Sequence, residues 1–280
     1  MTKTIDTLLD NIENLFINGK DLDETNLNIF LSNLKEILID RFKKKEDQKP
    51  GLRMSRIGVP NLRLWYDYYE PIPRDRVADF KFLYGDLIEQ LMLLLVKEAG
   101  HLVEDEQATV VVDGIEGHID CRIDGYVVDI KSTSNFAFKK FLHGTLDGND
   151  PFGYIAQLSG YMHAYNTDKG AFLAANKETG QRALYKPQAI DMINVPARIK
   201  EVKEVVSKAV KPTAKCYPPT PYGKSGNLTL DKNCSYCPHK FKCWMDANNG
   251  KGIRQFKYAN ETVDFVSVVN EPRVEEITTA

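Results

Sequence analysis

Two aspartates and a lysine flank a predicted hairpin turn. Asp120 lies in one expected strand, Asp129 in the next, and Lys131 two residues further on. Asp124-Gly125 is a strong two-residue hairpin signal, and both aspartates are nearly equidistant from it, so their carboxylates should come close across the strands. Lys131 shares a strand face with Asp129 because side chains alternate along a strand. Two carboxylates that hold Mg²⁺ or Mn²⁺, with an ammonium group beside them, suit the hydrolysis of a phosphodiester bond.

The alternative to a reaction centre is the charged, solvated face of a surface hairpin, and Asp-x-Lys alone is too common to decide between the two. The strand from Tyr126 to Ile130 is, however, apolar and β-branched, which is typical of a buried strand. A carboxylate and a lysine at the end of such a strand cost free energy unless they are paired or bind a metal ion. The pattern therefore favours a reaction centre.

Three further motifs accompany these strands. The helix before them carries Gly85-Asp86-Leu87-Ile88-Glu89, and a later helix carries Gln157 and Tyr161 one turn apart on one face. A cysteine-rich segment, 234–243, follows near the C-terminus. In this order, the motifs resemble the PD-(D/E)xK nuclease superfamily, and within it the RecB-like branch that includes CRISPR-associated iron–sulphur exonucleases and phage exonucleases. The resemblance covers about residues 52–245.

This resemblance implies an enzyme that hydrolyses DNA with Mg²⁺ or Mn²⁺. It implies that Gln157 and Tyr161 brace Lys131 or contact the DNA backbone. Taken alone, these two residues would be a polar helix face with a half-buried tyrosine. The implied metal ligands are the side chains of Glu89, Asp120 and Asp129 and the backbone carbonyl of Ile130. The implied catalytic residues are Glu89, Asp120, Asp129, Lys131, Gln157 and Tyr161.

The function implied by the resemblance is that of a phage-type DNA exonuclease in recombination, repair or degradation of host or viral DNA. It would act on DNA with a free end, with a single-strand annealing or recombination protein as a partner. Two alternatives stay open. One is a structure-specific endonuclease of the same superfamily, which needs no free end. The other is a catalytically inert DNA-binding accessory protein with a structural metal cluster.

A metal site is also expected near the C-terminus, where the cysteines follow the spacing Cys216-x17-Cys234-x2-Cys237-x5-Cys243. Four thiolates hold zinc or an iron–sulphur cluster, and spacing does not separate the two. The resemblance implies [4Fe-4S], which would fasten the C-terminal segment to the core. In those relatives the first cysteine usually lies upstream of the nuclease core, where this chain has Asn61, so either Cys216 or another ligand such as His239 replaces it. We expect Cys121 to be an ordinary buried residue.

The segment 51–70 is a candidate to hold DNA because it is rich in arginine, tryptophan and tyrosine. Arginine suits phosphate, and aromatic rings stack on unpaired bases. An exposed basic loop at the edge of an aromatic core is an equally good interpretation. Ser132, next to Lys131, could donate to a phosphate oxygen or belong to an ordinary polar loop. The predicted DNA-binding residues are Arg53, Ser55, Arg56, Arg63 and Ser132.

Apolar periodicity and turn signals predict the elements that position these groups. We expect helices within 1–47 and over 76–99, 151–166 and 195–210, strands over 107–112, 117–122, 126–130, 170–176 and 183–187, and an irregular segment over 51–70. This order predicts an α/β fold with a mixed central β-sheet flanked by helices. By the resemblance, its core is restriction-endonuclease-like. The expected parts are an N-terminal helical extension (1–50), a nuclease domain (51–245) that includes the metal-cluster segment 212–245, and a C-terminal tail (246–280).

Composition adds few constraints. The formal net charge of −2 gives no overall attraction to a polyanion, although a local basic groove would still bind one. No signal peptide is visible, and the longest apolar run, Leu91 to Val96, is too short to cross a bilayer. We therefore expect a cytoplasmic protein, in the host cytoplasm if it is viral, with no membrane partner. The sequence leaves the oligomeric state open.

Overall fold

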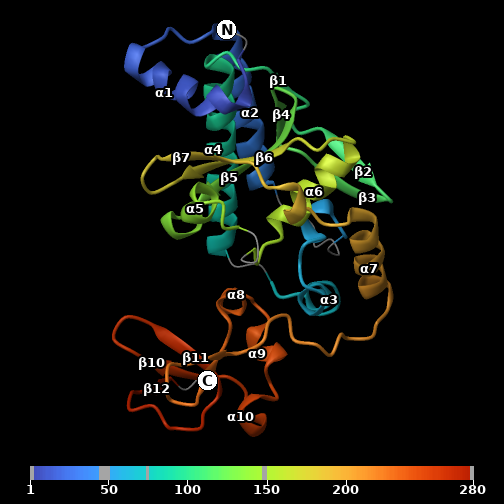
Figure 1. The fold of residues 1–280 in the computed structure, drawn as a ribbon, viewed down its shortest axis with the longest axis vertical. Helices are drawn as coiled ribbons and strands as arrows, with labels where there is room; N and C mark the ends of the chain where they lie inside the picture. Colours follow the sequence, from blue (N-terminus) through green and yellow to red (C-terminus); the bar gives the residue numbers. More distant parts are fainter. Residues whose placement is uncertain (1–2, 44–50, 74–75, 147–149, 278–280) are drawn as a thin grey trace. The chain divides into compact units, whose positions relative to one another are not determined.

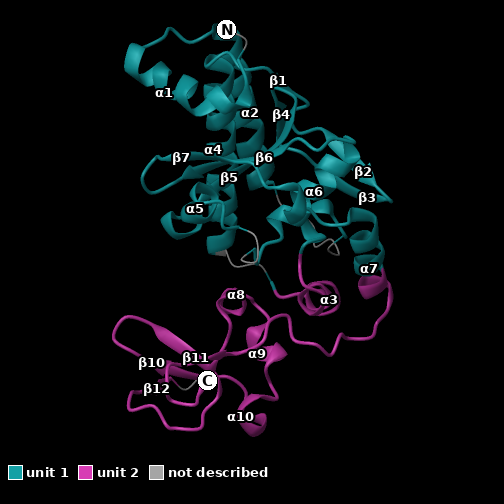
Figure 2. Ribbon diagram, viewed as in Figure 1, with its two compact units in different colours: residues 1–58, 73–203 teal, residues 59–72, 204–280 magenta. Residues whose placement is uncertain are grey.

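The computed structural model describes residues 3–43, 51–73, 76–146 and 150–277. The chain forms two compact units, shown in different colours in Figure 2. The first unit consists of residues 1–58 and 73–203, and the second of residues 59–72 and 204–280. These units do not follow the segment boundaries at 50 and 245 that the sequence suggests.

The first unit is built on a five-stranded sheet in the order β1-β4-β5-β6-β7 (Figure 1). Its central strands β5 and β6 are parallel, and the other neighbours pair antiparallel, so the sheet is mixed as the sequence predicts. The strands are β1 (Val103–Glu104), β4 (Cys121–Ile123), β5 (Tyr126–Thr133), β6 (Gly170–Asn176) and β7 (Arg182–Tyr185). A separate hairpin pairs β2 (Thr109–Val112) with β3 (Ile115–His118).

Helices flank this sheet, which makes the unit α/β. The helices of this unit are α1 (Leu8–Asn18), α2 (Glu24–Phe42), α4 (Arg76–Glu98), α5 (Asn135–Leu142), α6 (Tyr154–Ala164) and α7 (Val195–Ser207), whose last four residues belong to the second unit, with the short 3₁₀ helices η1 (Ile5–Thr7), η2 (Met54–Arg56) and η3 (Ala189–Asp191). The Asp23 carboxyl caps α2 by accepting from the amides of Thr25 and Asn26, as expected for an N-cap aspartate. Gly100 follows α4 in the left-handed region, at φ 76°.

The main core of this unit lies between α4 and one face of the sheet. Val128 and Ile130 of β5 pack there with Leu173 of β6. The second half of α4 contributes Met92, Leu93 and Val96, and the N-terminal helices contribute Ile5, Leu8 and Ile12. Side chains alternate along β5, so Asp129 and Lys131 project on the other side, where α6 contacts the strand.

Several predicted elements differ from the structure. The strand expected over 117–122 is divided into β3 and β4, because the chain changes partner at Ile119-Asp120. The segment 51–70, expected to be irregular, contains η2 and α3 (Asn61–Tyr69), and α5 was not expected at all. In α4, Val77 and Phe80 continue the apolar periodicity of the helix but are exposed, because the sheet covers the second half of the helix.

The second unit is small and has its own sheet, in the order β12-β10-β11-β9-β8. Its strands are β8 (Thr220–Pro221), β9 (Leu228–Thr229), β10 (Arg254–Lys257), β11 (Thr262–Ser267) and β12 (Glu276–Ile277), and its helices are α3, α8 (Lys232–Ser235), α9 (Lys240–Cys243) and α10 (Ala247–Gly250). Three of these strands lie in the expected C-terminal tail (246–280), where β10 and β11 bury Phe256 and Phe265. Across the described part of the chain, no helix is both long enough and apolar enough to cross a membrane.

Candidate active site

The hairpin between β4 and β5 brings the two predicted aspartates together. Asp124 and Gly125 have φ values of 49° and 82°, as a type I′ turn requires. The register pairs Cys121 with Val128, so Asp120 and Asp129 come next on the two chains and lie opposite each other. The Asp120 carboxyl accepts a hydrogen bond from the Ile130 amide, at 2.6 Å between Oδ2 and N. The predicted hairpin and the neighbouring aspartates are both confirmed.

Lys131 projects to the same side of β5 as Asp129 and pairs with it. The Lys131 ammonium donates to Asp129 Oδ1 at 2.7 Å. The Asp129 side chain is 1% exposed, and its second oxygen, Oδ2, is buried with no hydrogen-bond partner. A buried carboxylate oxygen without a partner is costly. Asp129 therefore has one oxygen satisfied by the protein and one that is open to a further ligand.

Glu89 adds a third acid from α4. Its Oε1 accepts from Gln107 Nε2 at 2.6 Å. Burial, together with the charges of Asp86 and Asp129, raises the pKa of Glu89 to about 7. Burial also raises the pKa of Asp120 well above its ordinary value, and the charges of Asp129 and Glu89 raise it further. The charge of Asp129 is therefore close enough to oppose the ionisation of both Glu89 and Asp120.

The charge of Lys131 is fixed by these acids. Burial alone would lower the pKa of the Lys131 ammonium, but the charges of Asp129 and Asp120 outweigh that effect and raise it. Lys131 therefore keeps its proton at any physiological pH. It offers a permanent positive charge next to Asp129, although one cation cannot balance three acids.

A divalent cation would suit this excess of acid. A cation would give Asp129 Oδ2 the partner that it lacks. It would also offset the charge of Asp129, which raises the pKa of Asp120 and Glu89. The Ile130 carbonyl is directed to the β4 side, because the N–H and C=O of one strand residue point to the same edge and its N–H meets Asp120. As the side chains stand, each carboxyl is turned to a protein partner, and no three His, Cys, Asp or Glu among the described residues converge on a single point.

The helix α6 presents Gln157 and Tyr161 as predicted. Gln157 Nε2 donates to the Tyr161 hydroxyl at 3.1 Å, so the two share one helix face. Burial raises the pKa of Tyr161, and so does the charge of Asp129, which indicates that this ring lies near the acids. The backbone of Gly117 packs closely here, since a Cβ on it would lie 2.8 Å from Tyr161 Cε1 and 2.5 Å from Met54 Cβ.

The sequence did not single out Tyr154, which contacts Lys131. The Lys131 Nζ lies 4.7 Å from the centre of the Tyr154 ring. Tyr154 is the first residue of α6 and stands three residues before Gln157, which places the two side chains on neighbouring positions of one helix face. From the sequence, that spacing could have placed Tyr154 on the same helix face as Gln157. Nothing local in the sequence, however, shows that Lys131 contacts this ring.

The predicted DNA-binding residues fall in both units. Arg53, Ser55 and Arg56 lie at η2 in the first unit, where Arg53 and Ser55 are exposed. Arg63 lies on α3 in the second unit and pairs with Asp67, at 3.8 Å between Nε and Oδ2. Ser132 lies one residue from Lys131 on β5, so it projects to the opposite strand face.

The four C-terminal cysteines gather in the second unit. All four are free thiols. Burial raises the pKa of Cys234 to about 12, and Cys216, Cys237 and Cys243 raise it further, so these thiols lie within electrostatic range of Cys234. Among the described residues, however, no three of them converge on a single point. The first turn of α3, where Asn61 stands, is part of the same neighbourhood, because Leu62 and the rings of Trp65 and Tyr66 pack with Cys216 and Cys243. Cys121, by contrast, is fully buried in the first unit, as predicted.

His239, the alternative cysteine-site ligand, is buried in the second unit. Its Nε2 lies 2.7 Å from Asp67 Oδ1, and its ring stacks on Tyr66. Its other nitrogen, Nδ1, is buried with no hydrogen-bond partner. A carboxylate on one ring nitrogen and an open second nitrogen is the usual arrangement of a metal-binding histidine, so His239 remains a candidate ligand beside the cysteines.

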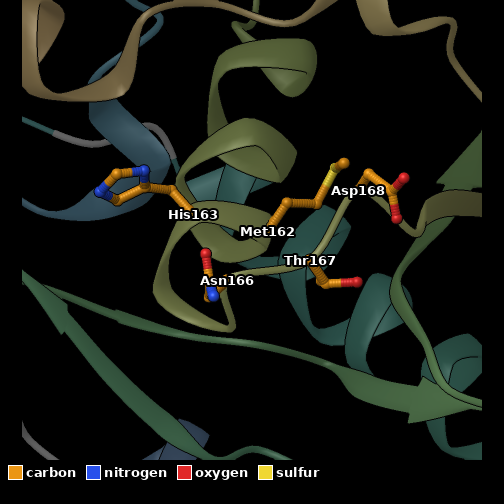
Figure 3. Close-up of a pocket in the computed structure, with 5 residues that line it drawn as sticks. All are labelled: Met162, His163, Asn166, Thr167 and Asp168. Atoms are coloured by element: carbon orange, nitrogen blue, oxygen red, sulfur yellow. The ribbon is translucent and has the colours of Figure 1, made fainter.

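An open hollow of about 470 Å³ lies at the C-terminal end of α6 (Figure 3). It is lined by Met162, His163, Asn166, Thr167 and Asp168. Figure 3 shows the His163 side chain pointing away from Asp168, so the polar groups do not converge. None of the predicted site residues lines this hollow.

Comparison with known proteins gives weak structural likenesses, of which two are described here. No family model matches the chain, and no curated protein matches it. The crystal structure of SSO0001 superposes with a TM-score of 0.39 at 14% identity, over 75% of this chain and 94% of that one. The alkaline exonuclease LHK-Exo from Laribacter hongkongensis gives a TM-score of 0.31 at 13% identity, over 62% of this chain and 89% of that one. With such low scores, the function has to be inferred from the side chains.

Proposed function

We propose that this chain is a metal-dependent deoxyribonuclease whose reaction centre consists of Glu89, Asp120, Asp129 and Lys131. The observation that carries the proposal is the state of Asp129. It is a buried carboxylate with one oxygen on Lys131 and the other without a partner, and its charge raises the pKa of two more acids, Glu89 and Asp120. A purely structural ion pair between Asp129 and Lys131 would not need Glu89 and Asp120 beside it.

In this proposal, the acids are metal ligands, and Lys131 provides a positive charge beside them. Glu89, Asp120 and Asp129, with the Ile130 carbonyl, would hold Mg²⁺ or Mn²⁺, which prefer oxygen ligands. Such an ion lowers the pKa of a bound water and offsets negative charge on the phosphate. Lys131 keeps its positive charge next to Asp129. It can therefore orient the attacking water or stabilise the charge that develops on the phosphoryl oxygens.

Gln157 and Tyr161 support this centre from α6. Because Gln157 donates to the Tyr161 hydroxyl, that hydroxyl remains free to donate its own proton to another acceptor. The burial that raises the pKa of Tyr161 keeps it protonated. In the proposed enzyme this hydroxyl donates to a phosphate oxygen or orders the groups around Asp129.

The finer proposal is an exonuclease of the RecB-like PD-(D/E)xK type, acting at a free DNA end in recombination, repair or DNA degradation. It is supported by the order of motifs along the chain and by the register of the β4–β5 hairpin, which places Asp120 and Asp129 next to the Cys121–Val128 pair. In this proposal, Cys216, Cys234, Cys237 and Cys243 bind an iron–sulphur cluster, with zinc as the alternative metal. Their proximity in the second unit supports it.

The test is a cleavage assay with matched variants. End-labelled linear DNA and closed circular DNA, each single- and double-stranded, are incubated with Mg²⁺, Mn²⁺ or no divalent ion. We expect ion-dependent cleavage of the linear DNA only. Asp129→Asn should lower the rate by at least about 10²-fold, whereas the exposed control Asp168→Asn should not change it. Cleavage of closed circles would point to an endonuclease, and full activity of Asp129→Asn would refute the assigned centre.

A further inference from the structure

The position of the Lys131 ammonium is defined by two contacts. One is the hydrogen bond to Asp129 Oδ1 at 2.7 Å. The other is the Tyr154 ring, whose centre lies 4.7 Å from Nζ. A cation over an aromatic face is attracted by the electron density of the ring, and the attraction strengthens when water is excluded. The side chain of Lys131 is only 17% exposed, so this contact is largely shielded from solvent.

The backbone before Tyr154 is held firmly. The Asp150 carboxyl accepts from the Gly153 amide at 2.9 Å and from the Ile155 amide at 2.8 Å, which fixes the first turn of α6. Gly153 has φ 77°, a conformation that favours glycine. Its backbone packs directly on Gly58, where a Cβ would lie 2.4 Å from Gly153 Cα. The start of α6 therefore has little freedom to shift.

The Tyr154 ring is itself supported by two phenylalanines. Phe152 stacks on it, with ring centres 5.5 Å apart, and Phe141 packs at 6.2 Å. Burial raises the pKa of Tyr154, so the ring stays uncharged at neutral pH. A neutral ring held on a fixed turn is a rigid surface against which a long, flexible lysine can rest.

We propose that Tyr154 is a positioning residue for Lys131: its ring face holds the ammonium in line with Asp129, so that the charge is in place before the substrate binds. The proposal rests on the proposed nuclease function. The positioning group is the aromatic face of Tyr154 and not its hydroxyl, because Lys131 Nζ lies over that face. Without the ring, Lys131 would remain charged but would sample several positions, and the cost would fall on the chemical step.

The kinetic test compares Tyr154→Phe with Tyr154→Leu on linear DNA with Mg²⁺. Tyr154→Phe keeps the ring face and should keep kcat within about twofold, whereas Tyr154→Leu should lower kcat about tenfold with little change in KM. The matched control is Tyr126→Leu, because Tyr126 lies at the other end of β5 and carries Lys169 and Lys186 over its ring. This control should leave kcat unchanged.

A second readout needs no catalysis. In protein labelled with [ε-¹³C]lysine and held without divalent ions, the Lys131 signal is the one that Lys131→Gln removes. The ring current of Tyr154 should shift the Lys131 Cε protons upfield in the wild type and in Tyr154→Phe, and Tyr154→Leu should abolish that shift. A partly misfolded Leu variant would be recognised because it would move the other lysine signals as well.

The outcomes separate the two proposals. If the wild type cuts DNA but Tyr154→Leu keeps its kcat, or if Tyr154→Phe loses as much as Tyr154→Leu, the positioning role is wrong and the nuclease function stands. An unshifted Lys131 signal in the wild type would also overturn the positioning role. If the wild type cuts no DNA at all, the nuclease function fails, and the positioning role falls with it even where the ring-current shift is present.

Discussion

The Asp120 carboxyl accepts a hydrogen bond from the main-chain amide of Ile130, at 2.6 Å between Oδ2 and N. The main-chain pairing of β4 and β5 begins one residue later, with Cys121 and Val128. The Asp120 side chain therefore takes the place of a main-chain carbonyl as the next hydrogen-bond acceptor between the two strands. Asp120 thus has a structural role, because one of its oxygens accepts a hydrogen bond from the β5 backbone. This role is additional to the metal-binding role proposed for it.

The structural role and the metal-binding role of Asp120 can be separated by substitution. Asp120→Asn keeps an oxygen that accepts from Ile130 but removes the charge, whereas Asp120→Ala leaves that amide without its partner. We expect Asp120→Ala to lose about 1–3 kcal/mol of the free energy of unfolding and Asp120→Asn to lose almost none, because burial already disfavours the charged form. Urea unfolding without divalent ions measures both. Both variants should fail to cleave DNA, and equal destabilisation of the two would contradict the hydrogen-bonding role.

Glu89 should make the ion-free protein less stable at alkaline pH. Its pKa is raised from 4.5 to about 7, so folding favours the protonated form. The associated stability is fully present below pH 4.5 and is lost as the pH rises through 7. We expect Glu89→Gln to raise the free energy of unfolding at pH 8 by on the order of 1–3 kcal/mol and to have little effect at pH 4.5. Urea unfolding at both pH values checks this, with the exposed Glu116→Gln as the control.

Added Mg²⁺ should reverse that effect in the wild type. An ion that binds only the folded state raises Tm, and it competes with the proton on Glu89, so the rise should be larger at pH 8 than at pH 6. Glu89→Gln should show a much smaller rise at either pH. A rise of the same size in the wild type and the variant would exclude Glu89 from the ion site.

The close packing of Gly117 should make this position sensitive to a single methyl group. A Cβ there would lie 2.5 Å from Met54 Cβ and 2.8 Å from Tyr161 Cε1, so Gly117→Ala should displace the Tyr161 ring and cost about 1–3 kcal/mol. Gly85→Ala is the matched control, because it lies within α4 with nothing within 4 Å of its Cβ, and it should be neutral or stabilising. Thermal unfolding and the cleavage rate measure both variants. A tolerant Gly117 would mean that Tyr161 has room to move.

The thiols of the second unit should carry a metal in the purified protein. We expect visible absorbance and iron from a [4Fe-4S] cluster, or stoichiometric zinc from the alternative site. Cys234→Ala should lose the metal and lower Tm, since a structural metal stabilises the folded state. Cys121→Ala, which removes a thiol from the core of the first unit, should keep the metal. Metal analysis of the two variants decides the matter, and a metal-free wild type would end the proposal.

The features that could be predicted from the sequence depend on residues close together in the chain. The β4–β5 hairpin follows from Asp124-Gly125 at its turn, and the turn alone sets which residues face each other, so Asp120 and Asp129 could be paired in advance. The helix α4 follows from its apolar periodicity. The exposure of Val77 and Phe80 could not be predicted from that periodicity, because they are as apolar as the residues that the sheet covers, and their exposure depends on where the sheet ends.

Where the sequence failed, the contacts were distant along the chain. Tyr154 meets Lys131 only because the turn before it packs on Gly58, almost a hundred residues earlier. Arg63 was grouped with Arg53 because they are neighbours in sequence, but α3 packs with residues beyond 204. Most of the second sheet could not be predicted, because β8, β9 and β12 have only two residues each, too few for alternation to be visible.

The second unit is not contiguous in the chain, and this has a consequence for biosynthesis. Its helix α3 emerges from the ribosome early, but Val205, Cys216 and Cys243, which cover Leu62, Trp65 and Tyr66, follow much later. At ordinary elongation rates that interval is roughly 10–30 s. During it, an aromatic helix stays uncovered on the nascent chain and is exposed to chaperones and to aggregation. Deleting the C-terminal residues from the gene would make that exposure permanent.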